Sequence, residues 1–92
     1  MLFVALMKAR PGTQAARSAR RLVWQVPDVG AEVLGEYWLQ TSDPACVAVF
    51  KADSCAQMWA AFAPWDDLFD VSIYPAVSAE EGLELLKQWP QP

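Results

Sequence analysis

The side chains in this sequence that could carry out chemistry are few. There is no histidine, which excludes triads in which histidine activates a serine or cysteine, as well as histidine-ligated haem and the usual catalytic zinc sites. Asparagine and a glycine-rich phosphate loop are also absent. We therefore expect no metal and no cofactor. The candidates that remain for acid–base or binding roles are Glu36, Tyr37, Trp38, Asp66, Asp67, Asp70 and Tyr74.

The adjacent carboxylates Asp66 and Asp67 have two interpretations. They could form a metal-binding or acid–base pair, but neighbouring residues in a turn rarely converge, and a calcium loop needs more ligands at fixed spacing. Aspartate favours turns because its side chain accepts hydrogen bonds from nearby backbone N–H groups. We therefore favour turn formation for this pair.

The two cysteines are expected to be free thiols. Cys46 begins a predicted strand and Cys55 lies just beyond its far end, which separates them by about 20 Å of extended chain. A disulfide needs Cα atoms within roughly 7 Å. We favour burial of both thiols, because free cysteine is among the most buried residue types. The alternative is a reactive Cys55, since a helix N-terminus can lower the pKa of a thiol.

Arginines on the predicted first helix form another candidate site. Arg17, Arg21 and Trp24 recur at i, i+4 and i+7, and Arg20 lies beside them, so they share one stripe of a helix. This stripe could bind an anion. Charge runs along helices are usually solvated, however, so we favour a solvent-facing stripe with an arginine stem against Trp24.

The segment from Ser54 to Val77 predicts a capped helix, a stop, an acidic turn and a strand. Ser54 and Gln57 have the spacing of a capping box. Pro64 cannot donate a helical hydrogen bond, so the helix should end near Ala63. Within this helix, an apolar stripe at helical spacing consists of Cys55, Met58, Trp59 and Phe62.

Trp59, Phe62 and Trp65 again allow two interpretations. An aromatic helical stripe is usually ordinary core packing, which we favour. The alternative is that these three side chains form the floor of an aromatic pocket.

The whole chain predicts the element order β-α-β-β-α-β followed by a short C-terminal helix. Strands are expected at 1–7, 31–40, 45–52 and 69–77, and helices at 13–26, 54–63 and 79–88. The first helix should bury a stripe of Ala15, Ala19, Leu22, Val23 and Val26. The order is that of the α+β ferredoxin-like fold, in which a four-stranded antiparallel sheet carries both main helices on one face. We expect one domain over residues 1–92.

Two of these strands, at 1–7 and 45–52, are apolar on both sides. The helices cover one sheet face only, and a large bare apolar face is rare in soluble monomers. A second copy offering the same face would cover it by two-fold symmetry. We therefore predict a homodimer through the helix-free face.

Composition restricts the partners. The net charge of −4 argues against nucleic-acid binding, which needs a clustered basic face. No apolar run approaches the ~20 residues of a membrane span, so we expect no membrane association and a cytoplasmic location. Hydrophobic residues make up 54% of the chain and include five tryptophans, an excess that also favours a partner surface.

Three motifs carry a resemblance that runs along nearly the whole chain, from Met1 to about Leu86. They are Val33-Leu34-Gly35-Glu36-Tyr37-Trp38, the stretch from Trp59 through Trp65-Asp66-Asp67-Leu68, and Asp70 to Val77. With them the chain resembles the dimeric α/β-barrel superfamily, and most of all a small bacterial family of unknown function within it. The resemblance implies a barrel formed by two copies. Relatives in that superfamily include cofactor-free oxygenases, isomerases and haem-binding enzymes, but fold alone does not fix function.

Three function classes stay open. The first, which we favour, is a homodimeric protein that binds a small apolar or aromatic ligand between sheet and helices. The second is a cofactor-independent enzyme, of oxygenase or isomerase type, that uses Tyr or Asp for acid–base chemistry in that cavity. The third is a dimeric accessory or interaction module. The candidate ligand-binding residues are Tyr37, Trp59, Phe62, Trp65 and Tyr74.

The second strand leaves the orientation of the pocket open. Either Leu34, Glu36 and Trp38 face the helices, or Val33, Gly35 and Tyr37 do. A buried Glu36 would need a polar partner or water, because an unpaired buried carboxylate is costly. We favour Tyr37 inward, with Tyr74 near the pocket mouth. Gly35 predicts a bulge or a close backbone approach in this strand.

Overall fold

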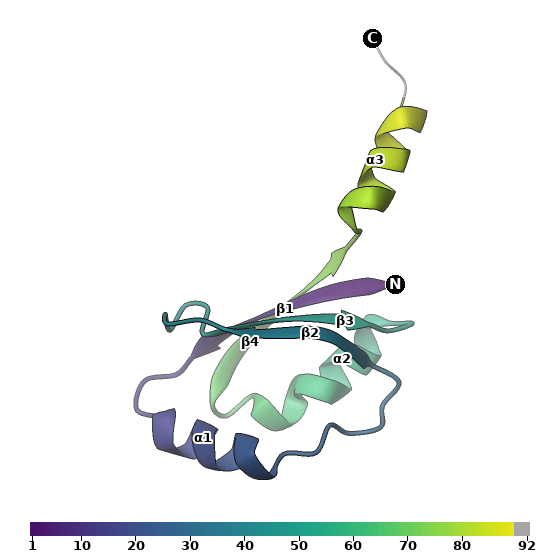
Figure 1. Ribbon diagram of the computed structural model, residues 1–92. Coiled ribbons are helices and arrows are strands. Elements are labelled where there is room, and N and C mark those ends of the chain that lie inside the picture. The colour runs from purple at the N-terminus through teal and green to yellow at the C-terminus, as the bar shows by residue number, and fades with distance from the viewer. Residues whose placement is uncertain (90–92) are drawn as a thin grey trace.

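The computed structural model describes residues 1–89 and builds them around a four-stranded antiparallel sheet (Figure 1). The strand order is β2-β3-β1-β4. The predicted α+β layout is confirmed. The elements in chain order are β1 (Leu2–Ala9), α1 (Gln14–Val23), β2 (Glu32–Trp38), β3 (Cys46–Lys51), α2 (Cys55–Phe62), the 3₁₀ turn η1 (Ala63–Trp65), β4 (Phe69–Ala76) and α3 (Ala79–Gln88).

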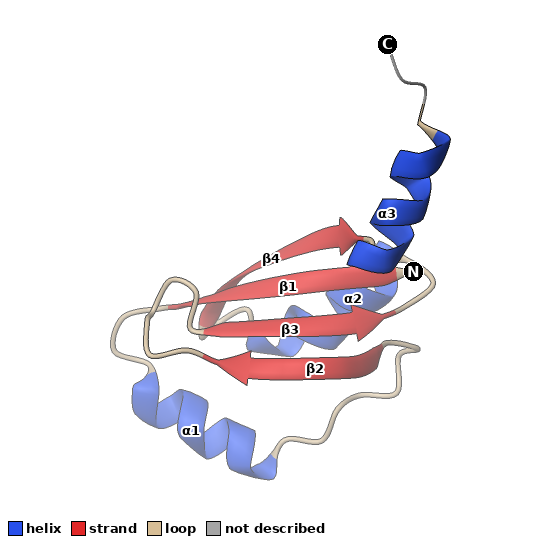
Figure 2. Cartoon of the chain, turned by 45° about the horizontal axis from the view of Figure 1, so that its top comes forward, coloured by secondary structure: helices blue, strands red, loops and turns tan. Residues whose placement is uncertain are grey.

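The two central strands carry apolar side chains on both faces, as predicted. Phe3 of β1 lies opposite Phe50 of β3, and both are buried on the face that the helices cover. Val4 lies opposite Val49 on the other face, where both side chains are half-buried. Figure 2 shows α1 and α2 behind the same face of the sheet. Neither of these helices covers the opposite face, which is called the helix-free face below.

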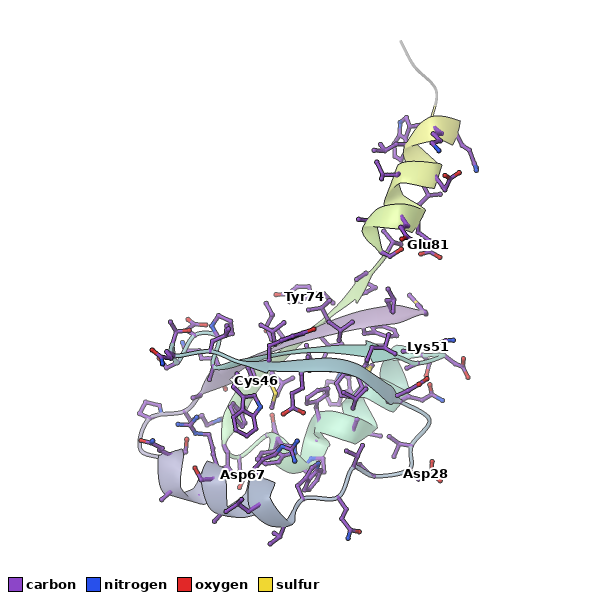
Figure 3. All side chains as sticks on the ribbon, in the orientation of Figure 1. Asp28, Cys46, Lys51, Asp67, Tyr74 and Glu81 are labelled. Atoms are coloured by element: carbon purple, nitrogen blue, oxygen red, sulfur yellow. The ribbon has the colours of Figure 1, made fainter. Side chains whose placement is uncertain are left out.

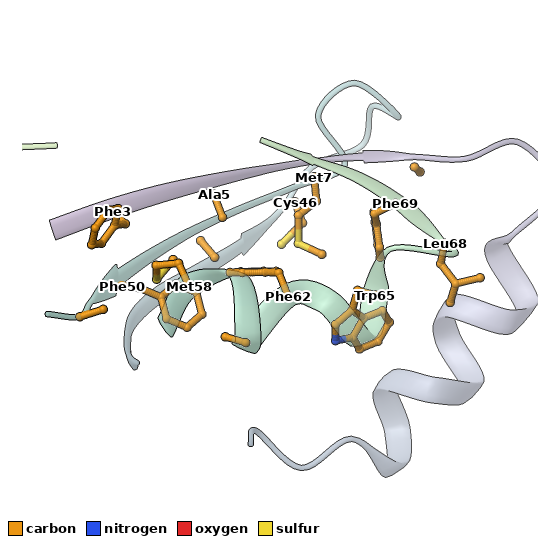
Figure 4. Close-up of a cluster of buried hydrophobic side chains, with 14 residues drawn as sticks. Phe3, Ala5, Met7, Cys46, Phe50, Met58, Phe62, Trp65, Leu68 and Phe69 are labelled. Atoms are coloured by element: carbon orange, nitrogen blue, oxygen red, sulfur yellow. The ribbon is translucent and has the colours of Figure 1, made fainter. Parts of the chain in front are cut away.

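Helix α2 supplies most of the helical contribution to the core. The Ser54 hydroxyl accepts a hydrogen bond from the backbone N–H of Gln57, and the side-chain oxygen of Gln57 accepts one from the backbone N–H of Ser54, so the predicted capping box is present. The helix ends at Phe62 and tightens into η1, which contains Pro64. Its buried residues are Met58, Ala61 and Phe62, and Figure 4 shows Met58 and Phe62 against the side chains of the sheet.

The apolar stripe expected on α2 is only half right. Met58 and Phe62 are buried, but Cys55 is exposed and Trp59 is 70% exposed. Eight residues make a short helix, and it covers the sheet with a narrow stripe at i, i+3 and i+4. Trp59 lies next to that stripe and points away from the core.

Helix α1 turns the other face towards the sheet than the sequence predicted. It ends at Val23, none of its residues is buried, and Leu22 is 86% exposed. The half-buried side chains are instead those of Arg17, Arg20 and Arg21. The arginines turn towards the sheet because they find aromatic rings and carboxylates there, interactions that a solvent-facing stripe would forgo.

A bulge in β2 overturns the simple alternation expected for that strand. Val33 pairs with Phe50 and Gly35 with Val49, so the register shifts at Leu34. The predicted irregularity at Gly35 is therefore confirmed. A Cβ atom on Gly35 would lie 3.0 Å from the hydroxyl oxygen of Tyr37, which shows how closely the tyrosine ring approaches this backbone.

Helix α3 leaves the end of β4 and extends away from the sheet (Figure 1). The Ser78 hydroxyl accepts a hydrogen bond from the backbone N–H of Glu81 at 3.0 Å and so caps the start of the helix. The helix has no buried residue, and Leu83, Leu86 and the following Trp89 are exposed. Among residues 1–89, no helix is both long and apolar enough to cross a membrane.

Candidate functional site

A cavity of about 510 Å³ separates α1 from the helix-facing side of the sheet. It exists because α1 is held to the rest of the chain by long arginine side chains and not by buried aliphatic ones. Its volume lies within the roughly 300–1,000 Å³ typical of small-molecule sites. The floor is apolar and comes from β1 and β3, with Met7, Cys46, Ala48 and Phe50.

One wall of the cavity is aromatic. Trp24, just after α1, meets Trp65 of η1 edge-to-face with a centroid distance of 5.1 Å, and Trp65 in turn meets Phe69 at 5.8 Å. Phe62 joins the lining from α2. Figure 4 shows Phe62, Trp65 and Phe69 gathered under the sheet. Such edge-to-face pairs hold the rings in fixed orientations, so the wall is preformed.

The opposite side of the cavity is lined by α1 and is polar. Gln14, Arg17, Ser18 and Arg21 all contribute to it. The Arg17 guanidinium carbon lies 5.6 Å from the centre of the Phe69 ring, and that of Arg21 lies 5.9 Å from the Trp38 ring. The solvent-facing stripe that we favoured from the sequence is therefore wrong, because both arginines lie over aromatic rings at the cavity.

Glu36 and Trp38 close the cavity at the β2 edge. Each pairs with a buried residue of β3, Glu36 with Ala48 and Trp38 with Cys46, so both face the helices. The indole N–H of Trp38 donates to a Glu36 carboxylate oxygen at 2.6 Å, and an Arg21 Nη donates to the same carboxylate at 3.4 Å. These are the polar partners that a helix-facing Glu36 requires, and 30% of its side chain remains exposed.

Tyr37 faces the other way, which corrects the predicted orientation. It pairs with Val47 on the helix-free face and is 61% exposed. The bulge at Leu34 decides this, because one extra residue reverses which later side chains of β2 face the helices.

The remaining predicted site residues divide into two groups. Phe62 and Trp65 line the cavity as expected. Trp59 is not part of the lining. Tyr74 pairs with Val4 on the helix-free face, and Figure 3 shows it on the side of the sheet opposite α1 and α2. The structure therefore brings two of the five candidates to the cavity and leaves Tyr37, Trp59 and Tyr74 elsewhere.

The Asp67 carboxylate is engaged by an arginine. Both of its carboxylate oxygens accept hydrogen bonds from Arg20, at 2.7 and 2.8 Å, and this arginine lowers the pKa of the Asp67 carboxyl. The backbone N–H of Asp66 donates to Ala63 in the turn after η1, in agreement with the favoured turn. Within residues 1–89 no cluster of three potential metal ligands occurs.

The two thiols differ. Cys46 is buried in the cavity floor, and burial, followed by the nearby Glu36 charge, raises the pKa of its thiol to about 11. It therefore stays protonated at neutral pH. Cys55 is exposed at the start of α2, contrary to the expectation that both thiols are buried, and neither cysteine forms a disulfide.

Sequence reasoning missed Trp24 and Cys46 as lining residues and favoured the wrong side for Arg17 and Arg21. The recurrence of Arg17, Arg21 and Trp24 at helical spacing was the available signal. It showed that they share a stripe, but the direction of that stripe depends on Asp67, which is 47 residues from Arg20, and on the distant aromatic rings.

Comparison with known proteins adds one match. A family model described as "Domain of unknown function (DUF3303)" matches residues 1–89. No curated protein matches the chain, and no solved structure does. The match covers all the strands and helices that position the cavity. The chain is thus a member of the family DUF3303, a domain of unknown function.

Proposed function

We propose that this protein binds a small ligand with an aromatic or apolar body in the cavity between the sheet and α1. The observation that carries the proposal is the cavity itself, of about 510 Å³, with an apolar floor and an aromatic wall. Ligand sites are typically concave and mostly apolar, with a few polar groups that orient the ligand. Arg17, Arg21 and Glu36 are polar groups of this kind.

A binding role is favoured over acid–base catalysis by the state of the ionisable groups. Among the described residues that line the cavity, Glu36 is the one carboxylate, and it is engaged by Arg21 and Trp38. The Cys46 thiol is held protonated by its raised pKa. The tyrosines that could serve an enzyme, Tyr37 and Tyr74, lie on the other face of the sheet.

We further propose that the protein acts as a homodimer through the helix-free face. Its central part consists of the half-buried side chains Leu2, Val4, Leu6, Val47 and Val49. Tyr37 and Tyr74 flank them and are exposed. A second copy is the occupant that fits, because the patch is apolar and a flat sheet face is self-complementary under two-fold symmetry.

Helix α3 supports the same assembly. It projects away from its own sheet and exposes Leu83, Leu86 and Trp89 (Figure 1). A chain that covers the helix-free face would offer these apolar side chains a surface. As both cysteines are free, which is usual in reducing compartments, we propose a cytoplasmic location.

The test of ligand binding compares two substitutions on the same helix. Ser18 lines the cavity from α1, whereas Ala16 is exposed and lies outside it. Isothermal titration with a panel of planar aromatic compounds should give saturable binding to the wild type and to Ala16→Phe. Ser18→Phe should abolish binding because the new ring occupies the cavity. Absence of saturable binding to the wild type across the panel would overturn the proposal.

A further inference from the structure

The three arginines of α1 differ in how far their charges are compensated. Arg20 donates two hydrogen bonds to the Asp67 carboxylate and a third to the carbonyl of Pro64 at 2.8 Å. Arg21 shares Glu36, but at 3.4 and 3.5 Å, which is long for a charge-assisted hydrogen bond. Arg17 has no carboxylate within 4 Å among residues 1–89, where the cations that form ion pairs are Lys8, Arg10, Arg20, Arg21 and Lys87.

Arg17 is half-buried, and its side chain makes one hydrogen bond within the described residues. Its Nε–H donates to the Thr13 hydroxyl at 3.0 Å, and its plane lies near the Phe69 ring. A guanidinium has five N–H donors. In residues 1–89 the structure gives no protein acceptor to the other four, which belong to the two terminal amino groups that form the fork of the side chain.

The charges lining the cavity do not cancel. Arg17 and Arg21 are its two lining cations and Glu36 is its one lining carboxylate, among the residues that the structure describes. One positive charge is left over, in a chain whose net charge is −4. This charge lies beside the aromatic wall of Trp24, Trp65 and Phe69.

We infer that the ligand of this cavity is a planar aromatic monocarboxylate. Its ring would lie against the aromatic wall, and its carboxylate would accept two parallel hydrogen bonds from the free fork of Arg17. Glu36 keeps Arg21 engaged and repels a second negative charge, so a monoanion fits better than a dianion. This inference rests on the proposed function and specifies the ligand class for that site.

The experiment uses two ring-matched probes, 2-naphthoate and the neutral 2-naphthamide. Isothermal titration at low ionic strength should show that the wild type binds 2-naphthoate roughly tenfold more tightly, since hydrogen bonds between two charged groups are stronger than those to a neutral amide and partial solvent exposure limits the gain. Added salt should narrow the difference because it screens the half-exposed pair.

Arg17→Gln should remove the preference, because the affinity for 2-naphthoate should fall to that for 2-naphthamide. The affinity for 2-naphthamide should stay unchanged. Lys87→Gln is the matched control, because it also removes one positive charge but lies on α3, where Lys87 pairs with Glu84. It should keep the full preference. If Arg17→Gln does not fold, as judged by circular dichroism, Arg17→Lys replaces it and should show a smaller loss, because lysine keeps the charge without the fork.

The outcomes separate the two proposals. Equal binding of both probes to the wild type, or an equal loss of both in Arg17→Gln, would overturn the carboxylate inference and leave cavity binding intact. Failure of both probes to bind the wild type would overturn the carboxylate inference, and failure of the whole aromatic panel as well would overturn cavity binding too. A preference that persists in Arg17→Gln would also refute the role of this arginine.

Discussion

The guanidinium of Arg20 and the carboxylate of Asp67 form a two-pronged ion pair, with N···O distances of 2.7 and 2.8 Å, that ties α1 to the turn before β4. Figure 3 shows Asp67 on the helix side of the sheet, close to α1. The Arg20 guanidinium also lies 5.4 Å from the centre of the Trp65 ring. Since α1 has no buried residue of its own, this contact is one of those that hold α1 over the cavity, together with Trp24 against Trp65.

The first prediction follows from this pair. Asp67→Asn keeps the shape of the side chain but removes its charge, so α1 should open more often. Amide hydrogen exchange should therefore speed up in Gln14–Val23 while exchange in β1 stays unchanged. Asp66→Asn is the matched control, because Asp66 has no ion-pair partner among residues 1–89. Unchanged exchange of α1 in Asp67→Asn would contradict this role.

The same pair predicts a pH dependence. Arg20 lowers the pKa of Asp67 below its ordinary value of 3.8, so the unfolded state binds a proton more readily than the folded state. The contribution of the pair is therefore complete above about pH 4 and is lost as the pH falls through the lower folded-state pKa. The difference in exchange between wild type and Asp67→Asn should be present at pH 7 and shrink below pH 4.

The second prediction concerns Cys46, whose burial raises the pKa of its thiol from 9.0 to about 11. Between these values the unfolded state loses the thiol proton and the folded state keeps it, so stability falls as the pH rises. By pH 11 the loss should reach about 2 kcal/mol. Urea unfolding at pH 8 and pH 10.5 should show that the wild type loses more unfolding free energy between these pH values than Cys46→Ala does. Cys55→Ala should lose as much as the wild type.

The thiols should also differ in reactivity. Iodoacetamide at pH 8 should modify the exposed Cys55 rapidly and the buried, protonated Cys46 slowly. Mass spectrometry of the native protein should find one label first. Addition of urea should bring the second label quickly. Equal rates for both thiols in the native protein would show that the cavity floor is more open than described.

The third prediction tests the assembly. Sedimentation at micromolar concentration should give a dimer. We expect its interface to bury on the order of 1,600 Å² in total, the usual size of a stable interface. Val4→Arg puts a charge at the centre of the helix-free face and should weaken the dimer roughly a hundredfold or more. Leu22→Arg, on the exposed side of α1, should leave it intact. A folded wild-type monomer under these conditions would refute the proposed dimer.

The fourth prediction distinguishes the tryptophans. Trp24 lines the cavity against Trp65, while Trp59 is exposed outside it. Trp24→Phe should therefore reduce the quench of tryptophan emission caused by an aromatic ligand, and Trp38 and Trp65, which also line the cavity, should account for the remainder. Trp59→Phe should lower the starting emission and leave the quench and the affinity unchanged. Loss of the quench in Trp59→Phe instead would place the ligand along α2.

Sequence alone determined the element order and the two-sided character of the central strands. Hydrophobic alternation, the Ser54–Gln57 capping box and Pro64 act over a few residues, so they can be read from the chain directly. Phe62 and Trp65 could be selected from the aromatic residues in and after the capped helix, but the same reasoning also selected Trp59, which is exposed.

Tertiary structure decided the orientation of α1 and β2, and with it the cavity. An apolar stripe on α1 would normally turn inward, but Arg20 meets Asp67 and Trp65 from distant segments, and this turns Arg17 and Arg21 towards the sheet. In β2, an extra residue at Leu34 brings Glu36 and Trp38 to the cavity and turns Tyr37 away. Both outcomes depend on contacts between segments far apart in the chain, which local spacing does not encode.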